Sequence, residues 1–274
     1  MGFSVNTNVG AMAALQSLNQ TNRDLSVTQN RINTSKNVAS TKDDSGAFAI
    51  AQTLRGDLGG LKGVTSSLNR AQSTVDVAIA GAEQISDLVN QMKAKAIEAS
   101  DSGLDAASRT SLAADVDGYK SQINTIIDSS EFNGTNLLKG GAGAASLAAL
   151  QSTDMAASKL TVANQDFTAI VTAIGATFNS DTTASAMVTA LDTATTNINA
   201  KLSTLGAASR KIAGQQNFIS KLSDVMEAGI SNLVDADLAK ESAKLQALQV
   251  KQQLGVQALS IANQAPQTVI SLFR

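Results

Sequence analysis

The chain has 274 residues, a formal net charge of -2, and neither cysteine nor histidine. The missing side chains exclude disulfides, thiolate nucleophiles and metal sites built on sulfur or imidazole, and they remove the usual proton carrier near neutral pH. The charge gives no reason to expect nucleic acid or an acidic membrane as a partner. An oxygen-only cation site or a pair of catalytic carboxylates stays open on composition alone.

The first predicted element is a helix over residues 1–36. Proline occurs once, at Pro266, so long helices can run without kinks. Residues 37–60 mix turn formers with a short apolar run, which we interpret as a connector containing a short helix. Within the N-terminal helix, one broad face holds Val5, Val9, Met12, Leu15, Leu18, Leu25 and Ile32.

The connector contains two adjacent carboxylates, Asp43 and Asp44, after Lys42. Successive helical residues do not face each other, so the pair makes a poor cation site. A role at a helix start beside Ser40 and Thr41 is the simpler interpretation.

Residues 61–99 carry the strongest periodic pattern, with apolar residues spaced alternately three and four apart. This repeat predicts a coiled-coil helix. Polar residues around Gly103 interrupt the pattern, which restarts over 112–126 and predicts a second helix that folds back antiparallel. The first stripe comprises Leu61, Val64, Leu68, Ala71, Val75, Ala78, Ala82, Ile85, Val89, Met92, Ala96 and Ala99.

Between about 133 and 180 the helical period disappears. Asn133-Gly134 predicts a tight turn, and residues 159–167 alternate as a short strand or hairpin arm would. We expect this short region to form the tip at which the chain reverses.

A spacing of seven then returns and predicts a second long helix. The fold class is therefore mainly α, a long antiparallel coiled-coil helix bundle formed by both chain ends with a short β-hairpin or turn region in the middle. The heptad positions are Leu191, Ile198, Leu205, Ile212, Ile219, Met226 and Leu233.

The last helix is apolar on two sides and stays apolar almost to the final residue. One intramolecular partner covers one side, so the other requires a further partner. We place Leu238, Leu245, Leu248, Val256 and Leu259 on one side and Ala243, Val250, Leu254, Ile261 and Ala265 on the other.

Together these stretches resemble bacterial flagellin, the subunit of the flagellar filament. The similarity covers nearly the whole chain and is carried by STKDDSGAFAIAQTLRGDLGGL, EFNGTNLL and the terminal LVDADLAKESAKLQALQVKQQLGVQALSIANQAPQTVISLFR. The resemblance implies a structural protein, not an enzyme, that polymerises into a helical homopolymer. It also implies export as an unfolded chain through the flagellar type III apparatus, without a cleaved signal peptide, to the extracellular filament.

The resemblance implies the domain organisation of a short flagellin, one without large outer domains. A terminal helical core domain of residues 1–36 and 235–274 lines the filament channel, and 37–60 form the connector. Residues 61–234 form an outer helical bundle that includes the β and loop region, with no separate variable outer domain.

The resemblance also assigns residues. Linker or subunit contact is expected at Lys42, Asp43 and Asp44, and no cofactor or metal site is expected. Because some flagellins are O-glycosylated, Ser180, Thr182, Thr183 and Ser185 are candidate sites. The implied polymerisation interface comprises Val5, Val9, Met12, Leu15, Val250, Leu254, Leu259, Ile261, Val269, Ile270, Leu272 and Phe273.

The implied partners are copies of this chain, an export chaperone, the filament cap and hook-filament junction proteins. Neither nucleic acid nor membrane insertion is expected. Two alternatives remain open: another axial or junction protein of the same apparatus, and a cytosolic coiled-coil adaptor.

Overall fold

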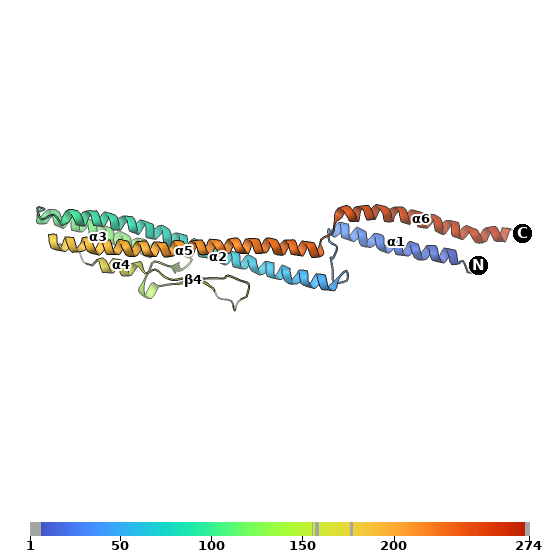
Figure 1. Ribbon diagram of the computed structural model, residues 1–274, viewed down its shortest axis with the longest axis horizontal. Helices are drawn as coiled ribbons and strands as arrows, with labels where there is room; N and C mark the ends of the chain where they lie inside the picture. The colour runs from blue at the N-terminus through green and yellow to red at the C-terminus, as the bar shows by residue number, and fades with distance from the viewer. Residues whose placement is uncertain (1–6, 155, 157–158, 176–177, 272–274) are drawn as a thin grey trace. The chain divides into compact units, whose positions relative to one another are not determined.

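The computed structural model describes residues 7–154, 156, 159–175 and 178–271, with only the backbone described for 265–271. These residues form a mainly helical fold, as the heptads predict (Figure 1). The chain divides into a terminal unit, Met1–Gly56 with Val225–Arg274, and a central unit, Asp57–Asp224. These boundaries differ from the expected ones, because one end of a long helix from each half of the chain belongs to the terminal unit.

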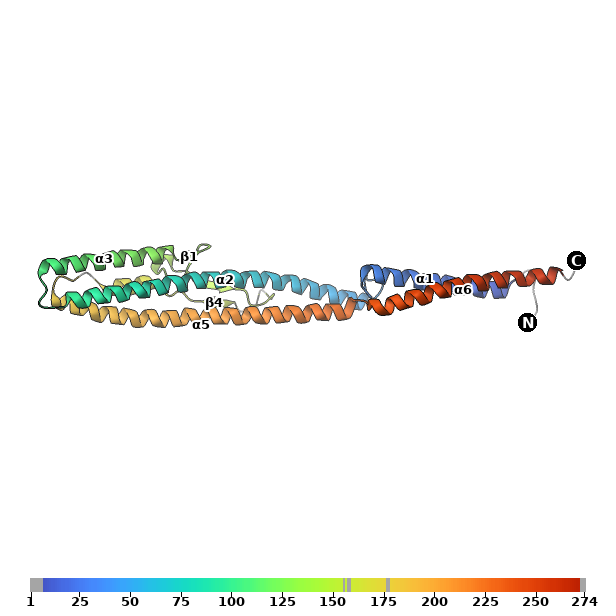
Figure 2. The ribbon, with the colours of Figure 1, turned by 90° about the horizontal axis from the view of Figure 1, so that it is seen from above.

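In the terminal unit, α1 (Val9–Thr34) and α6 (Leu238–Ser271) lie side by side (Figures 1 and 2). Residue numbers rise along one helix as they fall along the other, so the pair is antiparallel. Side-chain hydrogen bonds fix this register, from Asn8 to the Ala262 carbonyl at 2.7 Å, from Gln252 to Asn22 at 2.8 Å and from Arg31 to Glu241 at 3.3 Å.

A heptad seam joins the two helices. Its members are a mixture of leucine or isoleucine and small or polar residues at heptad spacing. A Cβ atom at Gly255 would lie 3.3 Å from Leu18 Cδ1. The least exposed side chains define the seam as Ala11, Ala14, Leu18, Thr21, Leu25, Thr28 and Ile32 on α1 with Glu241, Leu245, Leu248, Gln252, Gly255, Leu259 and Ala262 on α6.

The connector after α1 folds against the end of α5 (Asp181–Val234). Ser35 ends α1 in a left-handed conformation with φ of 56°. Backbone N–H groups of Asn37 and Val38 then donate to the Val234 carbonyl, at 2.8 and 3.2 Å. This contact closes a small core of Val38, Ala51, Ile230 and Val234.

The short helix expected within 37–60 is instead the first part of α2, which runs from Ser45 to Ala99. Asp44 caps it, since Asp44 Oδ1 accepts hydrogen bonds from the N–H groups of Gly46 and Ala47, at 2.9 Å each. The glycines between 56 and 63 each cost a helix about 1 kcal/mol relative to alanine, yet they do not interrupt it.

In the central unit, α2 packs beside α3 (Ala106–Ser129) and α5 (Figures 1 and 2). The predicted coiled-coil stripe of α2 is confirmed, because all twelve of its members are at most 4% exposed. Hydrogen bonds from Gln72 to Ser209 and from Gln216 to Asn69 fix the antiparallel register of α2 and α5.

The heptad of α5 holds from Leu191 to Ile219, whose members are at most 2% exposed. Beyond Ile219 the prediction is wrong, because Leu233 is 36% exposed and Val234 is buried in its place. A straight helix drifts by about 20° per heptad, so the buried stripe moves to a neighbouring position over this length.

The middle of the chain contains two small hairpins. β1 (Glu131–Phe132) pairs with β2 (Thr135–Asn136), and β3 (Leu147–Ala149) pairs with β4 (Leu160–Val162), both antiparallel. The predicted tight turn is confirmed: Asn133 and Gly134 have φ of 51° and 78°, as the mirror-image hairpin turn requires. A helix that the sequence did not predict, α4 (Phe167–Ile174), follows.

This region lies along the α2 and α5 helices, and the expectation that it forms the tip is wrong. The Leu150 N–H donates to Ser67 Oγ of α2 at 3.2 Å, and Gln215 Nε2 of α5 donates to the Gln151 carbonyl at 2.9 Å. The reversal is made by the short turn of residues 100–105, between α2 and α3.

Candidate functional site

Large apolar side chains project from both terminal helices into solvent. On α1, Val9, Met12 and Leu15 are 73%, 63% and 47% exposed. On α6, the corresponding exposures are 56% for Val250, 58% for Leu254 and 68% for Ile261. Six predicted interface residues therefore lie uncovered on a helix pair whose seam is already occupied.

The exposed side chains of α6 lie nearly opposite its seam. At about 100° per residue, Val250, Leu254 and Ile261 fall on one face, and Leu248 and Leu259 fall on the other. A helix that is apolar on two faces is normally buried on both. In this chain α1 covers one of them.

The structure agrees with one assignment of α6 and contradicts another. Leu259 is half-buried in the seam, on the side predicted to be covered. Val256, assigned to the same side, is 54% exposed because it lies about 70° from the seam. Val27, at 45% exposure, was missed, although it follows Val9 by about five helical turns. Outside the described residues lie Val5, Leu272 and Phe273, together with the side chains of Val269 and Ile270.

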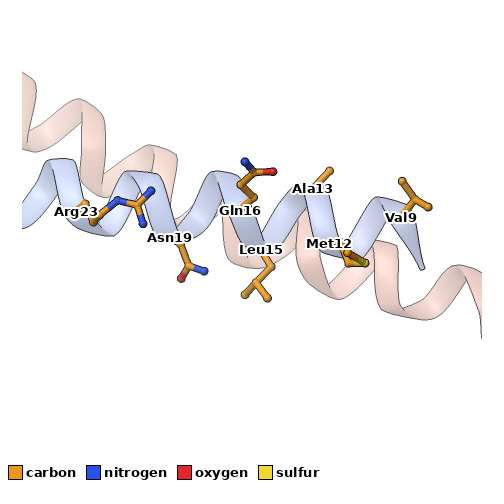
Figure 3. A pocket seen from close by; sticks show the side chains of 7 residues that line it. All are labelled: Val9, Met12, Ala13, Leu15, Gln16, Asn19 and Arg23. Atoms are coloured by element: carbon orange, nitrogen blue, oxygen red, sulfur yellow. The ribbon is translucent and has the colours of Figure 1, made fainter. Parts of the chain in front are cut away.

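The outer face of α1 forms a shallow groove of about 670 Å³ (Figure 3). Its apolar end carries Val9, Met12 and Leu15, and its polar end carries Asn19 and Arg23. Arg23 Nη2 donates to Gln20 Oε1 on the same helix at 2.6 Å, which holds the guanidinium along the helix surface.

The carboxylates of the connector are used within the chain. Asp43 Oδ2 accepts hydrogen bonds from the Ser40 N–H at 2.9 Å, from the Ser40 hydroxyl at 3.1 Å and from the Ala39 N–H at 3.1 Å. These bonds, the Ser40 N–H foremost, lower the pKa of Asp43. Asp44 caps α2, as the helix-start interpretation predicts, and Lys42 is exposed beside both.

In the described part of the chain, no group of three or more acidic side chains gathers closely enough to hold a metal ion. None of the helices described is both long and apolar enough to cross a membrane.

Two family models match the sequence, the bacterial flagellin N-terminal helical region over residues 5–143 and the bacterial flagellin C-terminal helical region over residues 188–273. Their combined span exceeds half of the chain. The chain belongs to the bacterial flagellin family.

Full-length flagellins are similar to it throughout. Flagellin FljM of Caulobacter vibrioides is 43% identical over 271 residues, which cover 99% of this chain and 98% of the relative. The flagellin of Brucella melitensis is 36% identical over 281 residues, which cover 99% of each. The crystal structure of Bacillus cereus flagellin, 23% identical, superposes with a TM-score of 0.52 over 56% of this chain and 88% of that one, and supports the fold alone.

The matched regions of this flagellin contain the long helices, and the segment between them is short. Residues 144–187 hold β3, β4, α4 and about the first two turns of α5. The chain is therefore a short flagellin without a large outer domain, as expected from its length.

The candidate glycosylation residues of this flagellin surround the start of α5. Ser180 Oγ accepts a hydrogen bond from the Thr183 N–H at 3.3 Å and so caps the helix. In return, Thr183 Oγ1 accepts hydrogen bonds from the N–H groups of Asn179 and Ser180, at 3.1 and 2.9 Å. The Thr182 hydroxyl donates to Asp181 at 3.2 Å. Thr182 and Ser185 are exposed, whereas Ser180 is half-buried.

Proposed function

We propose that this flagellin builds the flagellar filament by burying the outer apolar faces of α1 and α6 against neighbouring copies. The observation that carries the proposal is the exposure of 47–73% at six large apolar side chains on a helix pair whose seam is already filled. Large exposed apolar patches on soluble proteins mark interaction sites. The role is structural, and no catalytic step is part of it.

Burial of apolar surface favours assembly over an isolated pair of α1 and α6. Complete burial of a fully exposed Val, Leu, Ile or Met side chain contributes about 1.5–3 kcal/mol. Because the six side chains are 47–73% exposed, covering them offers about 5–11 kcal/mol before the costs of association. The seam itself contributes less, because small or polar residues such as Ala11, Ala14 and Gly255 occupy many of its positions. Most of the stability of a helix in a protein comes from the packing of its apolar face, so we infer that assembly stabilises α1 and α6.

The remaining expectations are proposals that rest on the family. They are export through the type III apparatus, an extracellular location, and binding to an export chaperone, the filament cap and junction proteins. Exposed Lys42 is the member of the connector trio that is free to meet another subunit, since Asp43 and Asp44 are engaged locally. Exposed Thr182 and Ser185 are the better candidates for O-glycosylation, and an intact mass equal to that of the bare sequence would exclude it.

The test is electron microscopy of the purified chain after salting-out. The intact protein is compared with a variant lacking residues 255–274 and with Ile261→Asp, which places a charge on the exposed face of α6. Gln249→Asp is the matched control, because it adds the same charge at an exposed polar position of the same helix.

Long filaments from the intact chain and the control alone would support the proposal, since a buried unpaired charge is strongly unfavourable. Filaments from the truncated chain would show that residues 255–274 are dispensable for assembly and would contradict the proposal. Failure of all four proteins to form filaments would favour a junction role.

A further inference from the structure

The central unit carries an acidic groove between α2 and α3. This groove, of about 490 Å³, is lined by apolar Val77, Ala80 and Ile126 and by polar Gln84, Ser129 and Ser130. Glu83 and Asp87 line its edge, and both are exposed. Neither carboxylate takes part in the ion pairs of the described residues. The groove therefore presents unneutralised negative charge beside apolar surface.

The same unit carries a basic ridge on α5. Arg210, Lys211 and Lys221 are exposed there, and Phe218 between them is 56% exposed. The sequence has no acidic residue from 209 to 221. A Cβ atom added at Gly214 would meet nothing within 4 Å, so the centre of the ridge is open to close approach.

We propose that the basic ridge of one copy docks into the acidic groove of another copy. This inference rests on the proposed function, because it assigns a second subunit contact within the same filament. Phe218 would cover the apolar part of the lining, and Lys211 and Lys221 would face Glu83 and Asp87. Charge complementarity carries the assignment, and aromatic side chains such as Phe218 are enriched at interfaces.

The placement of the two surfaces suits an open polymer. They are different surfaces of one chain, so their contact is head-to-tail and forms a continuing helix of subunits when the rotation does not close a ring. The hydrogen bond between Gln216 of α5 and Asn69 of α2 shows that the basic ridge lies level with Asn69 along α2. Gly81 in the groove is twelve residues further along that helix, which is about 18 Å, so successive copies are offset along their length.

The experiment reverses charge on one surface at a time. The groove variant is Glu83→Lys with Asp87→Lys, the ridge variant is Lys211→Glu with Lys221→Glu, and a third chain carries all four substitutions. The control reverses two exposed charges elsewhere on the central unit, Glu98→Lys with Lys159→Glu. The critical concentration for polymerisation is measured by sedimentation at about 0.1 M salt, where surface charges are incompletely screened. Circular dichroism confirms that each variant is folded.

Each one-sided variant should raise the critical concentration by about tenfold or more, because like charges would then meet at the contact. The four-substitution chain, and an equimolar mixture of the two one-sided variants, should return it to within about threefold of the control.

Unchanged critical concentrations in the one-sided variants would overturn the inference. The proposed function would survive that result as long as the chain lacking residues 255–274 still fails to polymerise. Loss in the one-sided variants without recovery in the mixture or the four-substitution chain would also overturn the pairing, and would point to a cap or chaperone as the partner of the groove.

Discussion

Arg31 of α1 forms an ion pair with the seam residue Glu241 of α6, with Arg31 Nη1 3.3 Å from Glu241 Oε1. The Glu241 side chain is 11% exposed, and its other oxygen, like Thr28 Oγ1, is buried without a hydrogen-bond partner in the described structure. A buried polar pair in a coiled coil fixes register at some cost in stability. We therefore expect this pair to specify how α1 and α6 align.

Replacing Arg31 with Met should destabilise the terminal unit by about 2–4 kcal/mol, because the Glu241 carboxylate is left buried without its partner. The double variant Arg31→Met with Glu241→Leu should recover most of that loss. The measurement is the temperature at which assembled filaments dissociate, followed by light scattering. Equal dissociation temperatures for the single and double variants would show that the carboxylate is not the cause.

A second prediction concerns the turn between α2 and α3. Arg109 is 8% exposed and donates from Nε to the Ala99 carbonyl at 2.9 Å and from Nη2 to the Asp101 carbonyl at 2.8 Å. Arg109→Leu should lower the free energy of unfolding of the central unit by about 2–3 kcal/mol, since two charge-assisted hydrogen bonds are lost.

Denaturant unfolding followed by circular dichroism measures this loss. Arg70→Leu is the control, because exposed Arg70 bonds to Ser66 on its own helix and closes no turn. Similar losses in the two variants would mean that Arg109 contributes no more than an ordinary surface arginine.

The long helices of the central unit were predictable because each buries one continuous apolar stripe. The face of α1 that packs against α6 was not predictable, because it is formed largely by Ala11, Ala14, Thr21 and Thr28. Small or hydroxyl side chains give no hydrophobic signal. The predicted apolar face included the larger Val9, Met12 and Leu15, although these side chains are exposed to solvent. An interface helix can carry its best apolar residues on the face that its own chain leaves open.

The middle region shows a different limit. Its turn follows from Asn133 and Gly134 alone, since both residue types tolerate positive φ. Its place beside α2 and α5 depends on contacts between distant residues, such as Gln151 with Gln215, which no local pattern encodes. The four buried residues of α4 do follow helical spacing, but eight residues are too few for the pattern to stand out: Phe167, Ile170, Val171 and Ile174.

The cap of α3 predicts a pH dependence. Asp105 accepts hydrogen bonds from the Ser108 N–H at 2.7 Å and from its hydroxyl at 3.0 Å, and these lower the pKa of Asp105 below its ordinary value of 3.8. A carboxylate with a lowered folded-state pKa stabilises the fold above its unfolded-state pKa, and this contribution is lost as pH falls through the folded-state value.

Asp105→Asn should therefore make the central unit less stable than wild type near neutral pH, and the difference should shrink as the pH falls through the lowered folded-state pKa of Asp105, because the amide does not titrate. Thermal unfolding across this range is the measurement. Asp224→Asn, at an exposed position inside α5, is the control. A constant difference between Asp105→Asn and wild type at all pH values would exclude titration of the cap as its source.

Two glycines that both face open space should respond to alanine in opposite directions. Gly134 has φ of 78°, whereas Gly63 lies inside α2 at ordinary helical geometry, and a Cβ at either position would meet nothing within 4 Å. Gly134→Ala should destabilise the central unit by about 1–2 kcal/mol, because a side chain is strained in the left-handed region. Gly63→Ala should stabilise it by about 0.5–1 kcal/mol through helix propensity. Because neither Cβ meets a neighbour, thermal unfolding of the monomers isolates the backbone effect, and shifts of the same sign would contradict it.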